Sequence, residues 1–226
     1  MNIINYGIVK FKINKSIKMS DIISFRGYIL NKFISNSETH NHTIEGNSIY
    51  RFPNIQYKII DKKLAIILYN NEINFLMNIY RDLNEIDLQG LKYIPEKELT
   101  IKSFEIKYTG EIFFKYQTVT YYLPFNQKNY DRFIKKDYTL EMAITNNLLE
   151  SLKGLGIILD NSQRIMVRNI QIFENTSIKN KNINFKAFKL SFETNLKLPN
   201  YISIGKRKSV GFGMLKEIYG NNCWFI

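Results

Sequence analysis

The alternation of hydrophobic and polar positions in the first half of the chain predicts four strands and two helices. Ile3–Ile13 is rich in Ile, Val, Phe and Tyr, as strands are. Ser20 can cap a helix whose apolar residues recur at helical spacing up to Ser35. The remaining strands are expected at 50–60, 64–69 and 99–108, and the second helix at 73–83. The order strand, helix, strand, strand, helix, strand predicts a four-stranded antiparallel sheet with both helices on one face, the ferredoxin-like plan.

The second half begins as if it repeats this plan. A strand is expected at 111–123, a helix through Leu140 and Leu152 that ends at Gly154, and further strands at 165–173, 183–192 and 214–219. Only about a dozen residues separate the strand at 183–192 from Gly205, too few for a full second helix. We therefore expect an α+β fold of two tandem ferredoxin-like (RRM-like) domains with antiparallel sheets, residues 1–110 and 111–226, the second domain degraded.

Composition narrows the class of protein. The chain has 226 residues, 45% of them hydrophobic, and a net charge of +12, which fits a folded protein that attracts polyanions. Heavy use of Ile, Asn and Lys could produce the same surplus without any function. The single cysteine, Cys223, excludes an intramolecular disulfide, and with two histidines a Cys/His zinc site is nearly excluded. No apolar run is long enough to span a membrane, and we expect a cytoplasmic protein. We also expect that it binds no metal or cofactor.

A glycine-rich basic segment, GKRKSVGFG, stands before the last expected strand. Glycine lets backbone N–H groups approach an anion, cations supply charge, and a serine hydroxyl can donate to phosphate. Phe212 could stack on a base or pack in the core. The alternative is an ordinary basic hairpin. The candidate RNA-binding residues are Gly205, Lys206, Arg207, Lys208, Ser209, Gly211, Phe212 and Gly213.

Two better-known motifs do not fit this segment. A P-loop needs Lys and then Ser or Thr after its second glycine, and here Phe212 follows Gly211. The octamer KSVGFGML looks like the aromatic strand of an RNA recognition motif. In that fold a helix and a strand still follow the motif, whereas only 13 residues follow Gly213. A basic glycine-rich loop that enters the last strand of a tandem ferredoxin-like chain, at Ile204–Met214, resembles the CRISPR repeat-processing endoribonucleases (the "Cas six" family).

The resemblance implies an enzyme that cuts precursor CRISPR RNA within each repeat without a metal ion. In many members a histidine after the first helix is catalytic, and some type I members resemble this chain in having two closely spaced histidines. His40 and His42 are the only histidines here, and histidine can act as general acid or base near neutral pH. From the residues alone they could equally be solvated, or a partial metal site with Glu38 and Glu45.

Further candidates surround the histidine pair. Tyr50 is the candidate third catalytic residue, as hydrogen-bond donor or orienting group. In some members of the family a tyrosine on the first helix also acts in catalysis, which makes Tyr28 a further candidate. Some members add a lysine beyond the histidine, and here that role could fall to Lys58, Arg51, Lys32 or the basic loop.

The resemblance, together with the histidine pair, thus implies a metal-independent endoribonuclease that leaves a 2′,3′-cyclic phosphate and a 5′-hydroxyl. The alternatives are a non-catalytic RNA-binding subunit of a CRISPR complex, or an unrelated tandem ferredoxin-like RNA-binding protein. The expected partner is CRISPR repeat RNA, and no association with a membrane is expected. Subunits of a CRISPR effector complex and a second copy of the chain stay open as further partners.

Overall fold

A computed structural model describes residues 2–33, 52–70, 73–180 and 183–219. The chain divides into two compact units, each treated separately below. The N-terminal unit consists of Ile3–Phe104 with the short stretch Ser209–Gly211. The C-terminal unit holds the other described residues, chiefly Glu105–Lys208.

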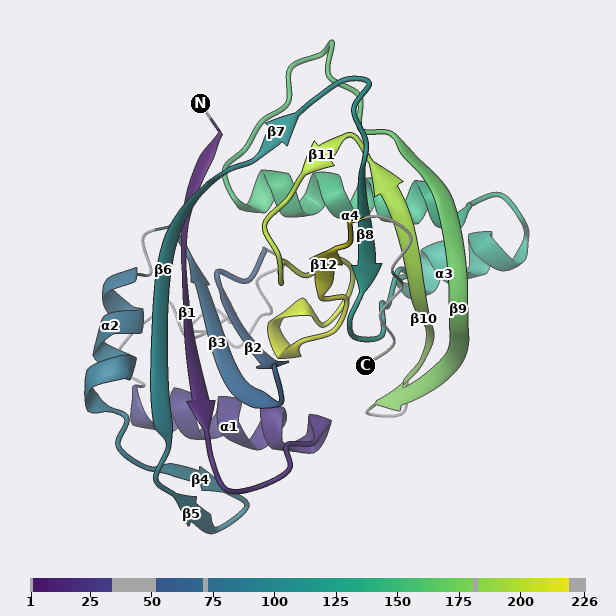
Figure 1. The fold of residues 1–226 in the computed structure, drawn as a ribbon. Helices are drawn as coiled ribbons and strands as arrows, with labels where there is room; N and C mark the ends of the chain where they lie inside the picture. Colours follow the sequence, from purple (N-terminus) through teal and green to yellow (C-terminus); the bar gives the residue numbers. More distant parts are fainter. Residues whose placement is uncertain (1, 34–51, 71–72, 181–182, 220–226) are drawn as a thin grey trace, which may run out of the picture. The chain divides into compact units, whose positions relative to one another are not determined.

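The N-terminal unit contains one four-stranded sheet in the order β2-β3-β1-β6, which Figure 1 shows. The β1–β3 and β2–β3 pairs are antiparallel. This is the expected ferredoxin-like order, and a small hairpin, β4–β5, follows the second helix. The elements are β1 (Ile3–Lys12), α1 (Met19–Lys32), β2 (Ile55–Ile60), β3 (Lys63–Tyr69), α2 (Ile73–Asp82), β4 (Ile86–Leu88), β5 (Leu91–Tyr93) and β6 (Glu96–Glu105).

Both helices of this unit pack on the same face of its sheet. The core contains alternate residues of the strands, such as Val9 and Phe11 of β1, together with Phe25 of α1 and Leu76 of α2. Alternate strand residues share one face, so the helices that contact them cover that face. At Gly7 a Cβ atom would lie only 2.3 Å from a methyl carbon of Leu76, so the missing side chain lets α2 approach β1 closely.

Several expected boundaries in the first half were wrong. The strand expected from residue 50 begins at Ile55, and the strand expected at 99–108 begins earlier, at Glu96, and is interrupted after Glu105. The β4–β5 hairpin was not expected at all. Its turn places Gln89 and Gly90 at positive φ, and the Asp87 side chain accepts a hydrogen bond from the Gly90 N–H (2.8 Å). Three-residue strands are too short for an alternating pattern to reveal them.

The C-terminal unit has a second four-stranded antiparallel sheet, in the order β12-β8-β10-β9. With β8 taken as its first strand, this order is the same as in the N-terminal sheet. Its elements are β7 (Lys107–Tyr108), β8 (Phe114–Thr118), α3 (Gln127–Ile134), α4 (Leu140–Gly154), β9 (Val167–Asn180), β10 (Ile183–Thr194), β11 (Leu196–Lys197) and β12 (Leu215–Glu217). A 3-10 turn, Lys208–Val210, begins at the end of this unit and continues into the stretch Ser209–Gly211.

The expected repeat is therefore confirmed, including its degradation. The helix α4 lies across the sheet (Figure 1), and no second helix occurs between β10 and β12 in the described part of this unit, only β11 and the 3-10 turn. The strand expected at 111–123 is shorter, Phe114–Thr118. The helix α3 was missed because its eight residues include none that is buried, so it leaves little hydrophobic pattern.

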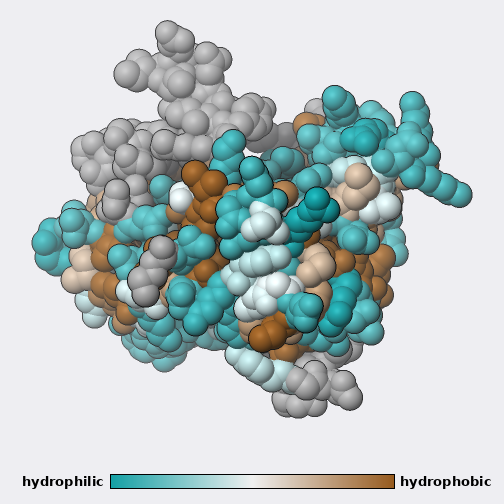
Figure 2. Space-filling model, turned by 90° about the horizontal axis from the view of Figure 1, so that it is seen from above, coloured by the Kyte–Doolittle hydropathy of each residue, from teal (hydrophilic) through white to brown (hydrophobic). Residues whose placement is uncertain are grey.

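Polar and charged side chains (teal) cover most of the described surface seen in Figure 2, and hydrophobic ones (brown) form smaller patches. Within the residues that the structure describes, no helix is both long and apolar enough to cross a membrane.

Candidate functional site

The proposed catalytic residues His40, His42 and Tyr50, and the alternative Arg51, lie outside the described residues. The other candidates of the N-terminal unit are described. Tyr28 and Lys32 lie one turn apart on α1, with the Lys32 Nζ 5.7 Å from the centre of the Tyr28 ring. Lys58 on β2 is fully buried, and burial holds its pKa well below the ordinary value. In the described ranges no three His, Cys, Asp or Glu side chains are grouped as a metal site would need.

The backbone of the glycine-rich segment is fixed by hydrogen bonds to the chain just after β8. The N–H groups of Lys206 and Gly213 donate to the carbonyl oxygens of Leu123 and Tyr121, both at 2.9 Å. These two N–H groups therefore stabilise the fold. From the sequence, N–H groups of this segment were expected to point at an anion instead. A hydrogen bond within the segment joins its two halves: the Arg207 carbonyl oxygen accepts from the Phe212 N–H (3.4 Å).

Two glycines of the segment are required by close packing. Gly205 has φ +82°, and a Cβ there would lie 2.6 Å from the Leu123 carbonyl oxygen and from a ring carbon of Tyr122. Gly213 has φ +65°, and a Cβ there would lie 2.0 Å from the carbonyl oxygen of Ile204. No other residue type fits either position without a shift of the backbone. Here glycine holds the segment in place instead of opening it to a ligand.

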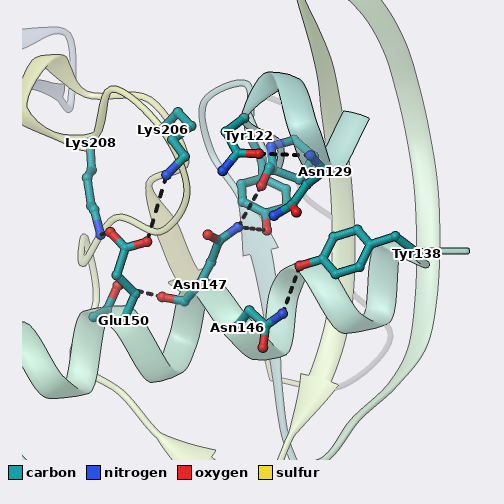
Figure 3. A network of polar contacts seen from close by, with 11 residues as sticks. Tyr122, Asn129, Tyr138, Asn146, Asn147, Glu150, Lys206 and Lys208 are labelled. Atoms are coloured by element: carbon teal, nitrogen blue, oxygen red, sulfur yellow. Dashed lines mark hydrogen bonds and ion pairs between the residues drawn. The ribbon is translucent and has the colours of Figure 1, made fainter. Parts of the chain in front are cut away.

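Lys206 and Lys208 share one carboxylate on α4, Glu150 (Figure 3). The Lys208 Nζ lies 2.7 Å from Glu150 Oε1, and the Lys206 Nζ lies 3.9 Å from Oε2. Lys208 is only 5% exposed. Burial lowers its pKa, and the hydrogen bond to Glu150 partly opposes that effect. Lys208 thus ties the loop to α4, whereas Lys206 stays half-exposed.

A buried polar network supports the same face of α4 (Figure 3). The Asn147 side-chain amide donates to the Tyr122 hydroxyl (2.6 Å) and to the Pro124 carbonyl oxygen (3.1 Å). Ser151 donates to the Asn147 carbonyl oxygen at 2.9 Å. Burial raises the pKa of Tyr122, so its hydroxyl stays protonated. The Tyr122 ring lies beside Gly205, so the network also supports the start of the loop.

The remaining loop residues divide between core and surface. Phe212 is buried, so of its two expected roles the structure favours packing in the core. Ser209 lies in the 3-10 turn and Gly211 has φ +86°. Arg207 is half-exposed and has φ +57°, which is unusual for a residue with a side chain. Its guanidinium carbon lies 5.7 Å from the centre of the Phe185 ring on β10.

Sequence reasoning missed the residues that support the loop, namely Glu150, Asn147, Tyr122 and Phe185. One signal was available. Asn147 and Ser151 interrupt the apolar stripe of the predicted helix at i and i+4, between Ile144 and Leu152. Polar residues on a buried face need partners, so this pair pointed to a polar contact beneath the helix. Nothing in the pattern connected that contact to a loop more than fifty residues later.

The fold and this loop define a tandem ferredoxin-like protein with a basic, glycine-rich segment before its last strand, a sheet type widely used in RNA binding. Family models agree with that class. The Cas6b N-terminal domain matches residues 2–105 and the Cas6b C-terminal domain matches residues 108–218. The chain therefore belongs to the Cas6b family.

Similar proteins support this membership. A crystal structure of Cas6b is 26% identical, with a TM-score of 0.81, and the match covers 96% of this chain and 100% of the other. A second structure, of the CRISPR RNA processing endoribonuclease Cas6b, is 25% identical with a TM-score of 0.71 and the same coverage. The uncharacterized protein MJ0978 of Methanocaldococcus jannaschii is 26% identical over 62% of this chain and 97% of its own length.

Proposed function

We propose that this chain is a metal-independent endoribonuclease that cleaves precursor CRISPR RNA within its repeat. The observation that carries the proposal is the family match, which spans both halves of the chain. A solved relative in the same family is named a CRISPR RNA processing endoribonuclease. The basic, glycine-rich loop of the C-terminal unit supplies a surface of the right charge for RNA.

The proposed chemistry is attack by the RNA 2′-hydroxyl on the adjacent phosphate. A general base takes the hydroxyl proton, and a general acid protonates the departing 5′-oxygen. His40 and His42 are assigned to these two roles, with Tyr50 as a donor or orienting group. The products are a 2′,3′-cyclic phosphate and a 5′-hydroxyl. Each proton transfer contributes about 10²- to 10⁴-fold to the rate.

The proposal divides the work between the two domains. Residues 1–110 carry the histidine pair, and residues 111–226 carry the loop that holds the RNA. Within the loop, Lys206 and Arg207 are half-exposed and Lys208 is buried. We therefore assign backbone binding to Lys206 and Arg207, and the anchoring of the loop to Lys208.

The test uses a repeat RNA from a CRISPR array of the same genome, incubated with the full chain in excess chelator. A copy with one 2′-deoxy nucleotide at the cut position serves as the control substrate. We expect cleavage of the all-ribose RNA alone, with a 2′,3′-cyclic phosphate on the upstream product. Cleavage of the deoxy copy, or dependence on Mg²⁺, would refute the mechanism. Tight binding without cleavage would instead identify a non-catalytic RNA-binding subunit.

Single variants test the assigned residues. His40→Ala and His42→Ala should each slow cleavage by about 10²-fold or more while RNA binding stays within about twofold. If neither variant is slower, the histidine assignment is wrong even if the enzyme cleaves repeat RNA.

A further inference from the structure

The three cations of the glycine-rich loop are not equivalent. Glu150 lies within ion-pair distance of Lys206 and Lys208. By contrast, within the part of the chain that the structure describes, no hydrogen bond or ion pair reaches the Arg207 guanidinium. Its contact there is with the ring of Phe185. The one loop cation with a planar, five-donor group is thus the one whose donors are left for a ligand.

The backbone at Arg207 supports a functional reason for this arrangement. Its φ of +57° lies in the left-handed region, which is unfavourable for a residue with a side chain. Three glycines of the same loop occupy that region without such a cost. A glycine at this position would relieve the strain, which is consistent with a role for the Arg207 side chain. Burial also lowers the pKa of Arg207, and a partly desolvated guanidinium forms stronger hydrogen bonds with a ligand.

Taking the proposed function as its basis, we propose that Arg207 and Phe185 form a site that reads an unpaired guanine in the RNA substrate. The guanidinium fork donates two parallel hydrogen bonds to guanine O6 and N7. Phe185 supports the guanidinium and offers an aromatic surface to the base. A phosphate could occupy the same fork, but the Phe185 ring beside the guanidinium offers a stacking surface that a base can use and a phosphate cannot.

A second arginine in the same unit provides a matched control. The guanidinium carbon of Arg168 lies 3.5 Å from the centre of the Phe113 ring, so this arginine also contacts an aromatic ring. Its Nε, however, donates to Glu193 at 2.9 Å. The two arginines therefore share an aromatic contact and differ in whether a carboxylate already binds the guanidinium. Only the Arg207 pair should respond to the identity of a base.

The experiment measures the affinity of the full chain for short single-stranded oligouridines protected from cleavage by 2′-O-methyl groups. Each probe carries one central guanosine, adenosine or 7-deazaguanosine. We expect the guanosine probe to bind about tenfold or more tighter than the other two, because adenine lacks O6 and 7-deazaguanine lacks N7. Arg207→Lys should abolish this preference while the salt dependence of binding stays unchanged, since the charge is kept. Phe185→Leu should reduce the preference, and Arg168→Lys should leave it intact.

Three results would overturn the proposal. They are equal affinity of the unchanged protein for all three probes, a preference that survives in Arg207→Lys, or a preference lost in Arg168→Lys. If Arg207→Ala weakens all three probes equally and lowers the salt slope by about one, Arg207 binds a phosphate. Cleavage is scored separately. An enzyme that cuts repeat RNA without a guanine preference would retain the proposed function and lose only this site.

Discussion

The two units of this protein arrange four strands in the same order but fill the last connection differently. In the N-terminal sheet, α2 connects β3 to the edge strand β6. In the C-terminal sheet, the corresponding connection from β10 to β12 contains β11 and the glycine-rich loop instead. A helix satisfies its own backbone hydrogen bonds, whereas an irregular segment must find partners elsewhere. The backbone groups of the loop bond to adjacent segments of the same chain. The conformation of the loop therefore depends on particular residues in those segments.

Those partners lie on both sides of the loop. Before it, the Ile204 N–H donates to the Gly213 carbonyl oxygen (3.0 Å), and the Ile202 carbonyl oxygen accepts from the Leu215 N–H (2.8 Å). Within it, Lys206 and Gly213 donate to the chain after β8. An irregular segment of this kind keeps its conformation only while each of these contacts is preserved. The degraded half of the repeat is therefore the half in which single substitutions should have the larger effect.

The largest effect is expected at Gly213. Gly213→Ala adds a Cβ 2.0 Å from the Ile204 carbonyl oxygen at positive φ, so the backbone must shift. We expect a loss of about 3 kcal/mol or more in the free energy of unfolding, measured by urea denaturation. The loop should also lose RNA affinity.

Gly90 in the N-terminal unit is the control for this change. It has φ +84°, but a Cβ there would meet nothing within 4 Å. Gly90→Ala should therefore cost only the backbone strain, about 1 kcal/mol. Equal losses in the two variants would show that steric contact at Gly213 contributes nothing.

Residue patterns predicted the strand orders far better than the loop contacts, and the reason is physical. The strand-forming residues of β1 and the helical spacing of α1 are local signals, so both elements could be predicted from the sequence, and residues such as Val9 and Phe25 lie in the core. The pairing of Lys208 with Glu150 joins positions 58 residues apart, and no periodicity reports it. The glycines were recognised as special, but for an anion, because the crowding around them is visible only in three dimensions.

Two buried lysines extend the comparison of the units. Lys58 in the N-terminal sheet is fully buried, and desolvation lowers its pKa well below the ordinary 10.5. Between that lowered pKa and about 10.5, the unfolded chain binds a proton that the folded chain does not. The free energy of unfolding should then rise with pH, by up to about 1.4 kcal/mol per pH unit from this group.

Lys58→Met removes this part of the pH dependence. We expect the variant to gain less stability than the unchanged protein between pH 8 and about 10, as measured by urea denaturation at each pH. Lys208→Met should remove a smaller part, because Glu150 opposes the shift in the Lys208 pKa. Parallel pH profiles for Lys58→Met and the unchanged protein would contradict the lowered pKa.

The smallest effect is expected at Glu150. Glu150→Gln leaves the Lys208 charge buried without its carboxylate, which should cost about 1 kcal/mol. The loss is modest because Glu150 itself is nearly half-exposed, with 46% of its side-chain surface accessible. Glu141→Gln on the exposed first turn of the same helix should change stability by only a few tenths of a kcal/mol.

A double-mutant cycle isolates the ion pair from the helix. In Lys208→Met the buried cation is absent, so adding Glu150→Gln should cost less than it does alone, with a coupling of about 0.5 kcal/mol or more. Additive losses would mean that the Lys208–Glu150 pair contributes no net stability, as expected if burial keeps Lys208 neutral in the folded protein. In that case Lys206 and Arg207 would supply the charge that the loop presents to RNA.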